Sequence, residues 1–186
     1  MRMFSGMFEG IAAMLVVVIA IYLVIAFVLV YFAADAQGRR SGNRDEGLGA
    51  RIVTSFLLTL TFQAALAGIA LFLAALFDGG PEIMTKMGIG LIVGAGVASI
   101  LPLVVQKSRV PALSAGARDF VGRKAIGINA IVTGAGSTVG LMGICVGLIV
   151  GEDLQPAVIA VTLVYTAGAV VTMLAVSKAG TPPVAG

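Results

Sequence analysis

Long apolar stretches that are almost free of charge constrain this chain more than any other feature. Five such segments can be drawn, each at least 21 residues long: 11–34, 52–77, 83–105, 125–150 and 156–176. A helix rises 1.5 Å per residue, so about 20 residues cross the roughly 30 Å hydrocarbon core of a bilayer. Barrel strands would instead alternate in polarity over about 10 residues. The sequence therefore predicts an all-α membrane protein, a single domain over 1–186 with five transmembrane helices.

Composition excludes the other classes of chain. Hydrophobic residues make up 59% of the sequence and charged residues only 11%, whereas soluble domains are about 25% charged. Disordered chains are poor in apolar residues, so disorder is excluded as well. The first apolar segment is longer than the roughly 7–15 residues of a cleaved signal peptide. We expect it to be retained as a transmembrane helix.

The positions of the basic residues predict the orientation in the membrane. With five spans, ten of the twelve Lys and Arg residues fall on one side. Lys178 lies in the tail, and the others form two basic loops: Arg39, Arg40, Arg44 and Arg51, then Lys107, Arg109, Arg118, Arg123 and Lys124. Cytoplasmic loops are enriched in Lys and Arg. We therefore expect an outside amino terminus, a cytoplasmic carboxyl terminus and a bacterial plasma (inner) membrane as the location.

Residues that carry out chemistry are scarce. The chain has no histidine and one cysteine, Cys145, which argues against a metal site built from these residue types. The carboxylates and amines lie at segment ends rather than deep in the membrane, where they would mark a proton or ion pathway. We expect no enzymatic activity, no cofactor and no nucleic-acid partner. The expected partners are membrane lipids, copies of this chain or other membrane subunits.

Glycines four residues apart suggest surfaces for helix packing. Such pairs form a flat groove that lets another helix approach closely and gain van der Waals contact. The pairs are Gly90 and Gly94 in segment 83–105, then Gly136 and Gly140, and Gly143 and Gly147, in segment 125–150. A second interpretation is that these glycines line a narrow path or a lipid groove.

Uncharged polar residues form a second candidate set. These side chains either bond between helices or line a conduit for water, an ion or a small solute. They are Thr59, Gln63, Asn129, Thr133, Ser137, Thr162, Tyr165 and Thr166. Pro102 predicts a kink late in segment 83–105, because proline removes a helical hydrogen bond.

A tandem two-helix repeat, 51–107 and 124–178, is a further prediction. Six residues recur 75 positions later in the chain: Leu66, Gly68, Ile69, Leu73, Asp78 and Pro81. Both halves would turn on the outside and return inside, as in a parallel repeat rather than an inverted one. Chance identity is the alternative, because a chain drawn mainly from Ala, Gly, Leu, Val and Ile matches itself readily.

Two functions fit this pattern. The first is a non-catalytic membrane subunit that packs through glycine-faced helices in a homo- or hetero-oligomeric complex. Its basic loops would meet a partner or anionic lipid. The second is a small oligomeric channel or transporter with an uncharged conduit lined by Thr, Ser, Gln and Asn.

The orientation is tested with an impermeant thiol reagent. In a Cys145→Ser background, Ser41→Cys should react only after the cells are permeabilised, because position 41 lies in a cytoplasmic basic loop. Gly79→Cys, in an outer turn, serves as the positive control. Labelling of Ser41→Cys in intact cells would show that the orientation is reversed.

Overall fold

A computed structural model describes residues 2–40, 42, 47–78, 82–109, 115–151 and 153–180. The described residues form five helices and no strand: α1 (Arg2–Arg40), α2 (Leu48–Asp78), α3 (Glu82–Arg109), α4 (Ala115–Val150) and α5 (Pro156–Gly180). All five contain a stretch that is long and apolar enough to cross a membrane. The predicted all-α membrane architecture is therefore confirmed.

The helices extend beyond the apolar segments. The helix α3 continues through Arg109, and α4 begins at Ala115, ten residues before the apolar segment starts. The residues of the second basic loop therefore lie on helical turns, not in a long loop: Lys107, Arg109, Arg118, Arg123 and Lys124. The bounds of the five apolar segments stay a prediction. Ala, Arg and Lys are strong helix formers, and long basic side chains reach from a helix end to the membrane surface. Arg44 lies outside the described residues.

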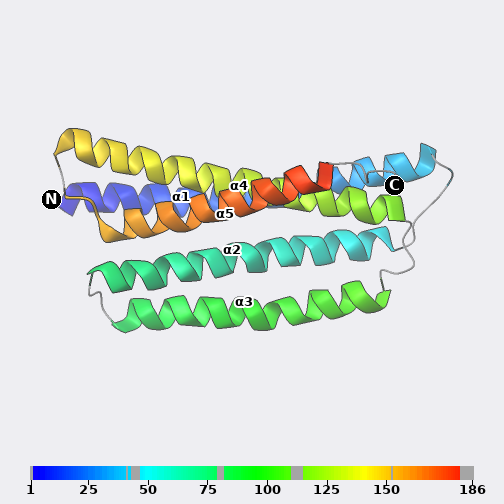
Figure 1. Cartoon of the computed structure of the whole chain (residues 1–186), viewed down its shortest axis with the longest axis horizontal. Helices are drawn as coiled ribbons and strands as arrows, with labels where there is room; N and C mark the ends of the chain where they lie inside the picture. Colours follow the sequence, from blue (N-terminus) through cyan, green and yellow to red (C-terminus); the bar gives the residue numbers. More distant parts are fainter. Residues whose placement is uncertain are drawn as a thin grey trace.

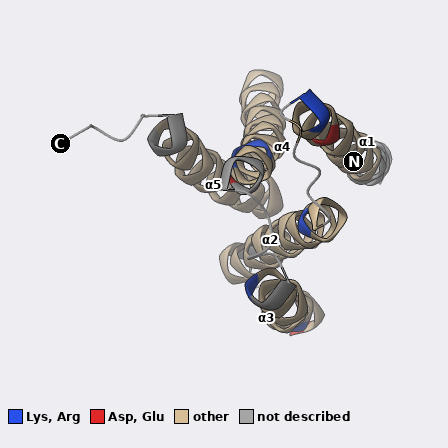
Figure 2. Cartoon of the chain, turned by 90° about the vertical axis from the view of Figure 1, so that its right-hand side faces the viewer, with Lys and Arg blue, Asp and Glu red and all other residues tan. Residues whose placement is uncertain are grey.

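The bundle consists of two antiparallel hairpins and a first helix (Figure 1). The hairpins are α2 with α3 and α4 with α5, and α2 is the central helix, in contact with all four others. Among the described residues, α3 contacts α2 alone, so it lies at the edge of the bundle (Figure 2). The first turns of α1 and the last turns of α2 and α4 share one end of the bundle, and the basic residues gather at the other (Figures 1 and 2).

Large side chains join α1 to the hairpins at the basic end. Leu23 and Phe27 of α1 pack with Ile52 of α2 and with Val121 and Val132 of α4 in one buried cluster. The Phe27 ring meets the Phe56 ring edge to face, with centroids 5.4 Å apart, an arrangement that adds to the stabilisation from burial. A second buried cluster contains Leu66 and Val164. Many other bulky aliphatic side chains are exposed, as expected of helices surrounded by lipid.

A glycine pair lets α2 and α3 approach closely. A Cβ atom added to Gly68 would lie 2.8 Å from the backbone oxygen of Gly88, and one added to Gly88 would lie 2.8 Å from the backbone nitrogen of Phe72. No side chain fits in this space, because backbone atoms cannot move aside as a flexible side chain can. Pro102 is buried on α3, which stays helical on both sides of it.

The two hairpins share topology and direction but not the register of their contacts. Gly68 faces Gly88, whereas Gly143, which corresponds to Gly68 at a shift of 75, faces Val158. The counterpart of Gly88 at that shift is Leu163, one to two turns further along α5. The repeat therefore stays a prediction.

The close contact between α2 and α3 is tested by two alanine substitutions that should change the stability of the protein differently. Gly68→Ala should destabilise the protein by about 1–3 kcal/mol, because the new Cβ overpacks against backbone. Gly96→Ala, with no described atom within 4 Å of its Cβ outside its own helix, should be neutral or gain up to about 1 kcal/mol of helix propensity. Denaturation in bicelles measures both, and equal effects would contradict the close approach.

Candidate functional site: glycine surfaces and a polar cluster within the bundle

The four candidate glycines of α4 face α5 of the same chain. A Cβ on Gly136 would collide with the ring of Tyr165, and one on Gly140 would lie 3.0 Å from the Cα atom of Thr162. A Cβ on Gly143 would lie 3.2 Å from Val158 Cγ1 in the first turn of α5, and one on Gly147 would lie 3.1 Å from Leu154 Cδ2, just before α5. This surface therefore builds the α4–α5 hairpin and is occupied within the chain.

Gly90 and Gly94 are placed differently. Neither has any described atom within 4 Å of an added Cβ outside its own helix. They lie with exposed Val97 and Leu101 on the side of α3 that faces away from α2. We call these four residues the outer face of α3. Spacings of four, three and four residues place them on one stripe of the helix.

Asn129 of α4 is the centre of a polar cluster with α2. Its side-chain nitrogen Nδ2 donates to Thr59 Oγ1 at 3.0 Å and to the backbone oxygen of Ala125 at 3.1 Å. Its oxygen Oδ1 accepts a hydrogen bond from Gln63 Nε2 at 3.0 Å. Thr59 is only 2% exposed. The cluster joins the middle of the apolar segment of α2 to the first turns of the apolar segment of α4, and such side-chain hydrogen bonds hold membrane helices together.

Hydroxyl pairs continue this polar seam from α4 to α5. Thr133 Oγ1 lies 3.1 Å from Thr172 Oγ1, and Ser137 Oγ lies 2.7 Å from Thr166 Oγ1. Thr162 instead donates to the backbone oxygen of Val158 in its own helix at 2.6 Å. Tyr165 lies with its ring against Gly136. The predicted polar residues thus come together at two helix interfaces, mostly as hydrogen-bonded partners.

The spacing of glycines along the sequence missed three glycines that take part in helix packing. Gly68 and Gly88 are on different helices, so no local motif links them. Gly168 of α5 has Leu66 and Thr133 within 3.3 Å of an added Cβ. A glycine within an apolar segment was a signal in each case, but only the tertiary arrangement shows which helix that glycine faces.

Several basic side chains contact other residues at the basic end of the bundle. The Arg51 guanidinium lies 3.6 Å from the Cβ position of Gly122, so it spans from α2 to α4. Arg39 pairs with Asp35 on α1, and Lys124 lies over the Phe120 ring at 5.6 Å. Arg40 and Lys107 are exposed on the helix ends. In the described part of the chain, no three His, Cys, Asp or Glu residues gather as a metal site.

The comparisons with known proteins add no identity. No family model, no curated protein and no solved structure matches this chain. The candidate functions therefore depend on the described geometry and on the sequence.

The polar cluster predicts an asymmetry between its two amides. Asn129→Leu removes two interhelical hydrogen bonds and leaves Gln63 Nε2 without its acceptor, so we expect a loss of about 1–3 kcal/mol. Gln63→Leu removes one bond, and interhelical bonds in membranes average about 0.6 kcal/mol. Thr61→Val is the matched control, because within the described residues the Thr61 hydroxyl bonds to Leu58 of its own helix. Unfolding in mixed micelles measures the three variants, and an equal or larger loss for Gln63→Leu would contradict the cluster geometry.

Proposed function

We propose that this chain is a non-catalytic integral membrane subunit that packs through the outer face of α3 against a helix of another subunit. The observation that carries the proposal is the open position of Gly90 and Gly94. Glycine in a helix costs up to about 1 kcal/mol relative to alanine. In lipid that cost is offset when a neighbouring helix packs closely against the glycine surface.

The position of α3 supports the same proposal. Gly136 and Gly140 of α4 already contact α5, and Gly68 already contacts α3. Among the described residues, α3 has α2 as its one neighbour, so its opposite side presents Gly90 and Gly94 with no described helix against them. The partner is a second copy of this chain or another membrane subunit.

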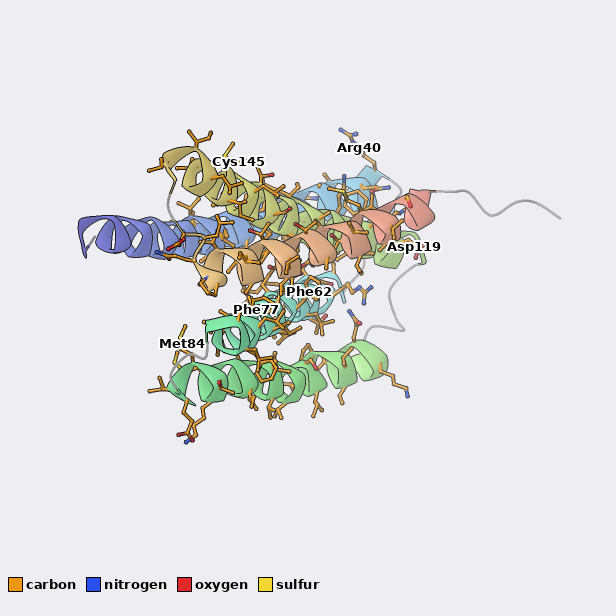
Figure 3. The ribbon with its side chains drawn as sticks, turned by 60° about the vertical axis from the view of Figure 1, so that its left-hand side comes forward. Arg40, Phe62, Phe77, Met84, Asp119 and Cys145 are labelled. Atoms are coloured by element: carbon orange, nitrogen blue, oxygen red, sulfur yellow. The ribbon has the colours of Figure 1, made fainter. Side chains whose placement is uncertain are left out.

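The charge distribution supports an orientation for this subunit. We propose a bacterial plasma membrane, with the basic end of the bundle at the cytoplasmic surface. Exposed Arg40 is the last residue of α1 at that end (Figure 3). Exposed Arg123 and Lys124 lie near the start of α4 at the same end. There they would face anionic headgroups, and the attraction is worth about 1 kcal/mol for each basic residue.

A second candidate function is a small conduit through the polar cluster. The specific observation in its favour is Gln63 Oε1, which is buried and accepts no hydrogen bond from the described residues. Purified protein in liposomes tests it, with a panel of ions and neutral solutes. Flux that Gln63→Leu alters would support the conduit, and no flux across the panel would oppose it.

The subunit proposal is tested on the outer face of α3. Gly90→Leu and Gly94→Leu should weaken assembly at least tenfold, about 1.4 kcal/mol, because leucine holds the partner helix away. Gly96→Leu is the matched control, since Gly96 is equally open but points to another side of α3. Native mass spectrometry from lipid nanodiscs measures the oligomer. Unchanged assembly in both variants would remove the proposal.

A further inference from the structure

A buried amide oxygen lies at the middle of the central helix. Gln63 is near the midpoint of the apolar stretch Leu48–Phe77 of α2. Its side-chain oxygen Oε1 has less than 1 Å² of exposed surface and accepts no hydrogen bond from any described residue. An amide oxygen in an apolar medium without a partner costs several kcal/mol. A native structure seldom leaves such a group unsatisfied.

The hydrogen-bond pattern settles which atom of this amide lacks a partner. The backbone oxygen of Ala125 can only accept, so the atom of Asn129 that faces it must be the donor Nδ2. The other atom, Oδ1, must then accept, and the Gln63 atom that faces it at 3.0 Å must be Nε2. Rotating the Gln63 amide would bring two oxygens together. The atom without a partner is therefore an acceptor.

A donor without an acceptor lies one turn away. The Thr59 hydroxyl accepts a hydrogen bond from Asn129 Nδ2 but donates none to the described residues. Thr59 and Gln63 are four residues apart on α2, so their Cβ atoms are about 5–6 Å apart on one face. A single small molecule can span that distance, accepting from Thr59 and donating to Gln63.

The chemistry of this position favours water as that molecule. The bridging group must both accept and donate a hydrogen bond, and a buried water typically makes about three. A cation is disfavoured, because no Asp or Glu lies in segments 52–77 and 125–150, and an unpaired charge in lipid is costly. We propose that Thr59 and Gln63 hold one internal water molecule at the α2–α4 junction. This site does not depend on the proposed function.

Water-edited solid-state NMR tests the site on the full chain in bilayers of deuterated lipid. In the unmodified protein, transfer from water to Gln63 Cδ should be at least threefold faster than to the Cβ atom of Ala70, a buried residue of the same helix. It should also be faster than to Thr172, whose buried hydroxyl bonds within the protein. Equal rates at Gln63 and Ala70 would overturn the proposal.

Two valine variants test the bridge itself. Thr59→Val removes the donor and should reduce transfer to Gln63 at least threefold. Thr61→Val removes a hydroxyl of the same helix outside the cluster and should leave the transfer unchanged. Fast transfer that persists in Thr59→Val would show that Thr59 does not hold the water. The measurement on the unmodified protein decides the question if Thr59→Val fails to fold.

Discussion

Close contact between helix backbones is the interaction on which the rest of this bundle depends. Lipid tails are as apolar as leucine, so burial of apolar surface cannot drive the helices together once they are in the membrane. The interactions that can hold the helices together are then van der Waals contact and interhelical hydrogen bonds. Both weaken steeply with distance, and Gly68, Gly88, Gly136 and Gly140 are the positions where side chains are absent so that helices can meet.

Interhelical hydrogen bonds form the second of these interactions. Asn129 reaches Gln63 and Thr59 across the α2–α4 junction, and Thr133 reaches Thr172 across the α4–α5 junction. Short side chains such as threonine bridge two helices only where the backbones are near each other. In return, the hydrogen bonds define the rotation of each helix, which van der Waals contact between flat surfaces does not specify well. Asn129 is decisive here, since its amide is oriented by its own helix through Ala125.

The sequence was enough to predict five membrane-spanning helices, because an apolar stretch of more than 20 residues has few alternatives in structure. The helix ends were harder, since the turns from Ala115 to Lys124 are helical but not apolar. The buried face of each helix was the hardest feature to predict. These helices are apolar all round, so no periodic pattern says which side is buried, and the spacing of Gly90 and Gly94 is the same as that of Gly136 and Gly140. Only the fold separates the pair that faces open space from the pair that faces α5.

The edge position of α3 gains meaning when the two hairpins are compared. Each is an antiparallel pair, and in the second one α5 contacts both α4 and α2. The corresponding helix of the first hairpin, α3, has α2 on one side and open glycines on the other. If the hairpins derive from one ancestral unit, α3 should have a second helical neighbour as α5 does. Within the described chain it has none. A helix from another subunit would supply it, and the interface would then repeat between subunits the α2–α5 contact found within one.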